Sequence, residues 1–129
     1  MTTLTKTMTT TEVANRLVGL CRKGKHMDAI QELYADNILS IEPKGSRHER
    51  TEGIKAVIAK ETEFFSMVEE IHSSEVSDAL VAENFFSITM KMDMTLKGMG
   101  NMKMDEVCVY EVEEGKIVSE QFFYIPTKM

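Results

Sequence analysis

A single carboxylate interrupts an apolar stripe in the C-terminal part of the sequence. The even-numbered residues of this stretch are Met102, Met104, Glu106, Cys108, Tyr110 and Val112. An alternation of period two places such side chains on one face of a β-strand. A buried carboxylate without a partner is costly, so its pKa should rise, and such a group is a candidate general acid or base. Alternatively, Glu106 lies at a strand end and reaches solvent or a lysine across the sheet.

A run of methionines leads to this carboxylate. The stretch ITMKMDMTLKGMGNMKMDEV, residues 88–107, holds six of the eleven methionines. On its first half the apolar residues again alternate with polar ones, as Phe86, Ile88, Met90, Met92, Met94 and Leu96. Thioether sulfur binds copper, but the hairpin contains no histidine, so we expect no metal here. Two interpretations remain, a packed core and an irregular apolar cavity, both of which suit flexible methionine side chains.

Composition narrows the class of protein. The chain has 129 residues, which is enough for one domain with a proper core, and 43% of them are hydrophobic. The net charge of −6 and the lack of a long basic run argue against a nucleic-acid partner. No apolar segment is long enough to span a membrane. We expect one domain over residues 11–129, preceded by a flexible leader over residues 1–10.

The two cysteines, Cys21 and Cys108, are too few for a disulfide framework or for paired zinc ligands. We therefore expect buried free thiols in a cytoplasmic protein, because the N-terminus also lacks the apolar core of a secretory signal. Nothing in the sequence points to a cofactor. These observations leave small-molecule chemistry by ordinary side chains as the function to look for.

The elements that position these residues fall into two blocks. A capping box at Thr9–Glu12 begins a first helix, which Gly24 ends. The segment 27–36 is predicted to be a second helix, and 37–42 a short strand that Pro43 halts. After a polar loop, Thr51 is a plausible cap for a third helix, whose apolar face extends to Val68.

After residue 69 the hydrophobic period changes from 3.6 to 2. Four strands are predicted, over residues 71–80, 84–96, 102–112 and 117–125, with turn residues between them. Helices first and an antiparallel meander last is an α+β pattern. The predicted fold is therefore about three N-terminal helices packed on one face of a strongly bent antiparallel sheet.

Three segments resemble a known family. YADNILSIEPKGS, then TEGIKAV, then YEVEEGKIVSEQFFY are similar to the SnoaL-like branch of the NTF2-like, cystatin-like superfamily, over residues 11–124. The segment YAD…EP is also similar, more distantly, to ketosteroid isomerases. This resemblance implies a cone-shaped α+β fold with a pocket open at one end. It also implies a homodimer formed through the outer face of the sheet.

The isomerase resemblance implies roles for two carboxylates. Glu42, just before Pro43, matches the position of the general base, and Glu106 is the nearest match to the carboxylate that binds the oxyanion. Leu17 stands where those isomerases have a tyrosine, so steroid isomerisation is not expected. SnoaL-type cyclases use a carboxylate from the sheet. The residues that could supply it are Asp93, Asp105 and Glu106. Which of Asp93, Asp105, Glu106 or Glu120 faces the cavity stays open at this point.

The expected function is that of a small pocket protein. If it is an enzyme, it performs cofactor-free acid–base chemistry of the isomerase, cyclase or lyase type on a small apolar carbonyl compound. The expected pocket residues besides the two carboxylates are Tyr34, Phe65, Met90, Met92, Met94, Met104 and Tyr124. The alternatives are a non-catalytic domain that binds a small ligand, and a dimeric association domain whose cone is filled.

Overall fold

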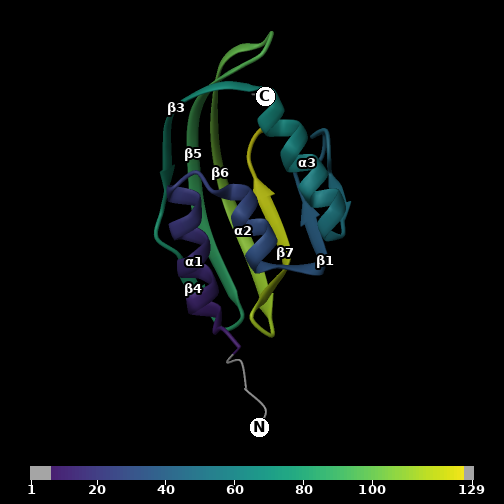
Figure 1. Cartoon of the computed structure of the whole chain (residues 1–129), viewed down its shortest axis with the longest axis vertical. Coiled ribbons are helices and arrows are strands. Elements are labelled where there is room, and N and C mark those ends of the chain that lie inside the picture. The colour runs from purple at the N-terminus through teal and green to yellow at the C-terminus, as the bar shows by residue number, and fades with distance from the viewer. Residues whose placement is uncertain (1–6, 127–129) are drawn as a thin grey trace.

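The computed structural model describes residues 7–126 and confirms the α+β architecture. The helices are α1 (Thr10–Arg22), α2 (His26–Leu33) and α3 (Ile54–Ser66). The strands are β1 (Tyr34–Ile41), β2 (Arg50–Glu52), β3 (Val68–Val76), β4 (Leu80–Ala82), β5 (Phe85–Leu96), β6 (Gly100–Glu113) and β7 (Lys116–Phe123). Figure 1 shows the three helices on the same side of a curved sheet.

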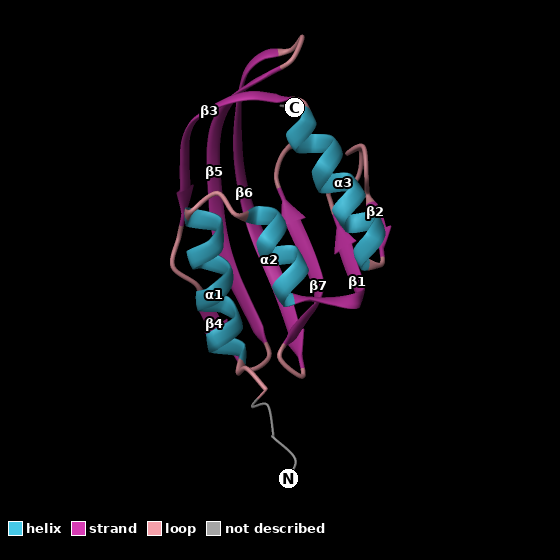
Figure 2. Ribbon diagram, viewed as in Figure 1, coloured by secondary structure: helices cyan, strands magenta, loops and turns pink. Residues whose placement is uncertain are grey.

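The strands form one mixed sheet in the order β2-β1-β7-β6-β5-β3, with β4 paired to β5. Neighbouring strands are antiparallel except for β1 and β7, which are parallel. The antiparallel sheet predicted for the strands after residue 69 is confirmed, and β1 extends that sheet as a parallel neighbour of β7. Parallel neighbours need a crossover connection, and here α3 and strands β2 to β6 together supply it. Figure 2 shows β1 and β7 side by side behind α2 and α3.

The core lies between the helices and the inner face of the sheet. Its fully buried side chains include Val13 and Leu17 of α1, Leu33 of α2, Ile38 of β1 and Ile117 of β7. These residues follow the helical and strand periods of the sequence, so hydrophobic burial positions the helices over the sheet. None of the helices in residues 7–126 combines the length and the apolar character that crossing a membrane requires.

The first helix begins as predicted. Thr9 Oγ1 accepts the backbone N–H of Glu12, and the Glu12 carboxylate accepts the N–H of Thr9, which is a complete capping box. Thr10, the last residue of the expected leader, belongs to α1. Residues 1–6 of that leader lie outside the described residues. The helix ends before Gly24, whose φ of 73° suits glycine.

Two other boundaries differ from the predictions. Tyr34, Ala35 and Asp36 continue as strand β1 and not as helix, because Tyr34 pairs with Ile117 of β7. The third helix starts at Ile54, since Gly53 with φ 89° turns the chain at its cap. Thr51, expected as the cap, lies in β2.

The late strands follow the predicted alternation with shifted ends. Strand β3 spans residues 68–76, and part of the expected 71–80 strand and its turn forms β4. In the β5–β6 hairpin, Met90 is directly opposite Glu106, Met92 opposite Met104 and Met94 opposite Met102. Directly opposed residues of an antiparallel pair share a face, so Glu106 and the methionines all lie on the inner face of the sheet.

Candidate functional site

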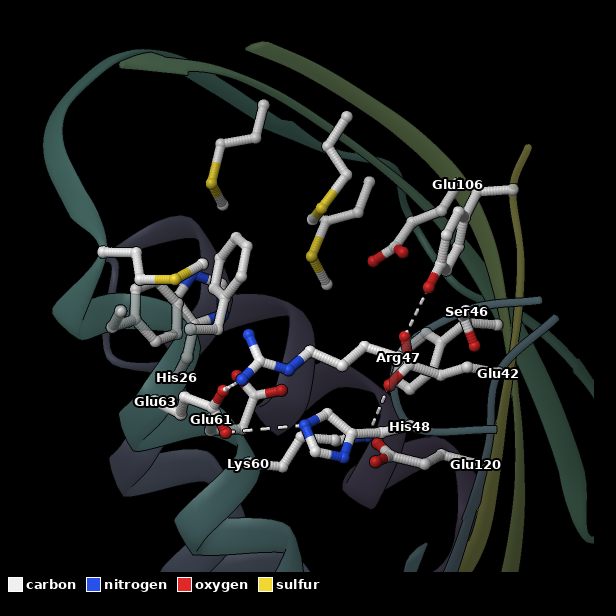
Figure 3. Close-up of a pocket in the computed structure, with 18 of the residues that line it drawn as sticks. His26, Glu42, Ser46, Arg47, His48, Lys60, Glu61, Glu63, Glu106 and Glu120 are labelled. Carbon is white, nitrogen blue, oxygen red and sulfur yellow. Dashed lines mark hydrogen bonds and ion pairs between the residues drawn. The ribbon is translucent and has the colours of Figure 1, made fainter. Parts of the chain in front are cut away.

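A cavity of about 440 Å³ lies between the helices and the inner face of the sheet. One part of its wall is apolar, formed largely by methionine, phenylalanine and leucine side chains. The other part is polar and carries Glu42, Lys60, Glu61, Glu106 and Glu120. Figure 3 shows the sulfur atoms in the upper part of the cavity with the Glu106 carboxyl group beside them, and Glu42, Glu61, Glu63 and Glu120 below.

Glu120 is fully buried at the floor of the polar end. The Tyr34 hydroxyl and the Ser40 hydroxyl, at 2.7 Å, both donate hydrogen bonds to its carboxylate. The register explains this arrangement, because Ser40 is the parallel neighbour of Glu120 across the β1–β7 pair. Burial raises the pKa of Glu120, although Lys60 and the two hydroxyl donors oppose the shift. Both oxygens of Glu120 thus accept a hydrogen bond from a hydroxyl group.

Lys60 connects Ser40, the partner of Glu120, to Glu42. Its side chain is 7% exposed, and its ammonium group donates to Ser40 Oγ at 2.8 Å and to Glu42 Oε2 at 2.9 Å. Tyr124 Oη donates to the other oxygen of Glu42 at 2.6 Å. Both partners of Glu42 are donors, so Glu42 acts as an acceptor. A continuous chain of hydrogen bonds therefore connects Tyr34 to Tyr124.

Glu106 of β6 lies on the sheet side of the cavity and is poorly partnered. Its side chain is nearly buried at 8% exposed, and the Cys108 thiol is its hydrogen-bonding partner, at 3.7 Å from Oε1. Figure 3 shows its carboxylate directed into the cavity. Desolvation raises the pKa of Glu106 to about 8, the Cys108 thiol opposes the shift, and the nearby carboxylates of Glu42, Glu61 and Glu120 add to it. Glu106 is therefore largely protonated at neutral pH and can donate a hydrogen bond.

Two ionisable groups of the helices complete the polar end. Glu61 of α3 is half-buried, and desolvation followed by the charge of Glu120 raises its pKa to about 7, against the effect of Lys60. His26 of α2 stacks on Phe65 with ring centroids 5.4 Å apart, and burial lowers its pKa. At neutral pH the imidazole of His26 is thus uncharged.

The loop between β1 and β2 covers one side of the cavity. Arg47 of this loop forms an ion pair with Glu63 of α3 at 2.6 Å, and His48 Nε2 lies 3.5 Å from the same carboxylate. Figure 3 shows the Arg47 side chain reaching across toward α3. The contact ties the loop that carries Glu42 to the helix that carries Lys60 and Glu61.

The structure brings most of the predicted site residues together. The cavity is lined by Glu42, Glu106, Tyr34, Phe65, Met90, Met92, Met104 and Tyr124. Met94 does not line it and is instead fully buried among Met92, Leu96 and Met102. Leu17, which by the isomerase resemblance stands where those enzymes have a tyrosine, also lines the cavity.

The structure also separates the four carboxylates that the sequence left open. Glu106 and Glu120 line the cavity, whereas Asp93 and Asp105 do not. Asp93 is opposite Lys103, and Asp105 is opposite Lys91, at positions of the hairpin that alternate with the inward-facing methionines. Both aspartates therefore belong to the outer face of the sheet.

Lys60, Glu61 and Ser40 were not predicted. Lys60 and Glu61 follow the buried Val57 by three and four residues, so they continue the inner stripe of α3. Ser40 lies between Ile38 and Glu42 in the alternation of β1. The helical spacing of Lys60 and Glu61 and the strand alternation of Ser40 were the features of the sequence that could have indicated that these residues face inward. Across residues 7–126, no three His, Cys, Asp or Glu side chains are grouped so as to hold a metal ion.

Comparison with known proteins shows the family of this chain. The family model for the SnoaL-like domain matches residues 8–124. A proposed SnoaL-like polyketide cyclase from Mesorhizobium loti has a similar structure, with 31% identity, a TM-score of 0.85, and coverage of 91% of this chain and 100% of that one. No curated protein sequence matches the chain.

Two more distant structures share the fold. A protein of unknown function with a cystatin-like fold from Xanthomonas campestris is 18% identical, with a TM-score of 0.78 and coverage of 94% and 95% of the two chains. A hypothetical protein with a ketosteroid isomerase-like fold from Catenulispora acidiphila, solved in complex with trimethylamine, is 15% identical, with a TM-score of 0.71 and coverage of 91% and 88%. The chain therefore belongs to the SnoaL-like domain family and has the NTF2-like, cystatin-like α+β fold.

Proposed function

We propose that this protein is a cofactor-free acid–base catalyst that moves a proton next to a carbonyl group of a small, largely apolar compound. The observation that carries the proposal is Glu106, a nearly buried carboxyl group that faces an apolar cavity with a neutral thiol as its partner. The solved relative from Mesorhizobium loti is described as a proposed polyketide cyclase, which supports carbonyl chemistry.

The two carboxyl groups take different roles. Protonated Glu106 donates a hydrogen bond to the carbonyl oxygen, where negative charge develops as the enolate forms. Glu42, the acceptor between Lys60 and Tyr124, takes the proton from the α-carbon. The proton then returns from Glu42 to a carbon of the enolate, so no oxidant or cofactor takes part. The methionine wall holds the apolar body of the substrate.

Deuterium exchange tests this function without knowledge of the product. A panel of small cyclic and aromatic ketones is incubated in D₂O with the protein, and loss of the α-proton signal is followed by NMR. We expect accelerated exchange for at least one ketone. Both Glu106→Met, which removes the hydrogen-bond donor, and Glu42→Gln, which removes the base, should reduce this rate by about 100-fold or more.

An exposed glutamate provides the matched control. Glu113 lies on the same strand as Glu106 but is exposed, so Glu113→Gln should leave the exchange rate unchanged. If the wild type accelerates exchange for no ketone while ketones still bind, the alternative of a non-catalytic ligand-binding domain replaces the proposal. If Glu106→Met exchanges as fast as the wild type, Glu106 is not the donor.

We infer that two copies associate through the outer face of the sheet. Val107 and Phe123 are direct neighbours on β6 and β7, and their side chains are 42% and 49% exposed. An apolar pair at the centre of an exposed sheet is a typical association surface. Sedimentation at micromolar concentration should show a homodimer, and Val107→Lys should shift it toward monomer. Lys103→Glu, a charge change on the same strand, should not. A monomeric wild type would contradict the inference.

A further inference from the structure

The cavity is lined by more carboxyl groups than lysine and arginine side chains. Around Glu61 the other charged or titratable lining groups are Glu42, Glu63, Glu106, Glu120, Lys60, Arg47, His26, His48, Tyr34, Tyr110, Tyr124 and Cys21. Lys60 is paired with Glu42, and Arg47 with Glu63. Glu120 is satisfied by two hydroxyl donors. The carboxyl groups of Glu61 and Glu106 are left without a cationic partner in the described chain.

Glu61 and Glu106 approach the cavity from different walls. Figure 3 shows the Glu61 carboxyl group coming from α3 and that of Glu106 from β6, with the cavity between them. Within residues 7–126, Glu61 forms no side-chain hydrogen bond, and Glu106 has a single weak one, to a thiol. Glu106 is more than nine-tenths buried, and its second oxygen accepts no hydrogen bond from the described residues. The cavity thus offers unused acceptors and no unused cation among its described lining residues.

We propose that the ligand of this cavity carries a protonated amine, whose ammonium group binds Glu61 while its apolar body lies against Met90, Met92 and Met104. This assignment rests on the proposed function and narrows its substrate class to small apolar compounds that bear an amine as well as a carbonyl group. Glu106 remains available to the carbonyl oxygen from the opposite wall. An ammonium group supplies three donors, which suits a carboxylate that has none.

The same charges disfavour other ligand classes. An anionic compound would bring a further negative charge into a cavity that already has an excess of carboxyl groups, which is unfavourable in partly desolvated surroundings. A metal ion needs several ligands close together, and the described residues contain no such group. A monovalent organic cation needs one carboxylate and an apolar wall, both of which this cavity has.

Binding of the amine should be coupled to a proton. Burial and the charge of Glu120 raise the pKa of Glu61 to about 7, so this group is partly protonated near neutral pH. A cation binds the ionised form, so binding releases protons, and amine affinity should rise about tenfold between pH 6 and pH 8. A neutral ligand lacks this coupling.

Three probes that share one skeleton test the proposal by isothermal titration calorimetry. They are 2-phenylethylamine, 2-phenylethanol and 3-phenylpropionate, which are cationic, neutral and anionic at pH 7.5. We expect the amine to bind about tenfold more tightly than the alcohol, a typical effect of one charged hydrogen bond, and the carboxylate to bind weakest. Titration in two buffers of different ionisation enthalpy should show proton release for the amine alone.

The variants locate the effect. Glu61→Gln should reduce the preference for the amine over the alcohol to less than about threefold and remove most of its pH dependence, with the affinity for the alcohol unchanged. Glu113→Gln makes the same charge change on the surface and should change nothing. Equal or weaker binding of the amine relative to the alcohol overturns the proposal, as does a preference that survives Glu61→Gln.

This result is separable from the proposed catalysis. Glu106→Met should abolish deuterium exchange but keep most of the preference for the amine, because Glu61 is retained. If the alcohol binds best and ketones still exchange, the amine assignment fails and the catalytic function stands. If the amine preference holds and no ketone exchanges, the amine assignment stands and the catalytic function fails.

Discussion

Replacement of Lys60 by methionine should lower the free energy of unfolding by about 3 to 5 kcal/mol. Lys60 is nearly buried and donates to both Ser40 and Glu42, so its removal leaves a carboxylate without its ion-pair partner in a partly desolvated site. Methionine fills a similar volume, which keeps the loss of packing small. Urea unfolding at pH 7, with the transition midpoint and slope fitted together, measures the change.

Lys55 provides the control for this substitution. It lies on α3, five residues before Lys60, but its side chain is exposed. Lys55→Met should therefore change the free energy of unfolding by less than about 0.5 kcal/mol. A double variant, Lys60→Met with Glu42→Gln, should recover part of the lost stability because the uncompensated charge is gone. A loss below about 1 kcal/mol for Lys60→Met would mean that water reaches the ion pair.

Replacement of Glu106 by glutamine should have the opposite effect and should depend on pH. The pKa of Glu106 is about 8 in the folded protein and has an ordinary value of 4.5. Because the folded state holds the proton more tightly, protonation favours folding. The favourable contribution is fully present below pH 4.5 and is lost as the pH rises through 8.

Glutamine cannot ionise, so the variant avoids this loss. At pH 7 Glu106→Gln should be more stable than the wild type by an amount on the order of 3 kcal/mol, and the two proteins should converge near pH 4.5. Melting temperatures from pH 4 to 9 measure the difference, with Glu113→Gln as the surface control. Parallel curves for wild type and Glu106→Gln would show that the group is solvated, and the catalytic role would fail with it.

Local periodicity predicted most of the fold because it reports which face of each element is buried. The capping box of α1 and the alternation of β5 and β6 appear in the structure as expected. The parallel pairing of β1 and β7 could not be predicted in this way. Register between strands separated by some eighty residues depends on tertiary packing, and no local pattern of Tyr34 or Ser40 records it.

The candidate site was predictable where a polar residue breaks an apolar stripe. Glu106 is such a residue, and the alternation alone places it on the inner face. Lys60 and Glu61 break the stripe of α3 in the same way, but charged residues in a helix are usually solvated, so their inward position was missed. Met94 was expected in the wall because alternation gives the face of a strand, but it does not tell which side chains of that face are covered by their neighbours.

The parallel β1–β7 pair also bears on the order in which the domain folds. Strand β1 forms early in the sequence, yet its neighbour β7 is the last strand of the domain, and the Tyr34–Glu120 contact spans 86 residues. Closing so long a loop is slow, because its entropy is lost before the contact stabilises anything. During synthesis the helices and β1 therefore remain without their central neighbour until β7 leaves the ribosome. The buried polar floor is completed last, and a nascent chain that stops before β7 exposes Ser40 and Ile38 to chaperones.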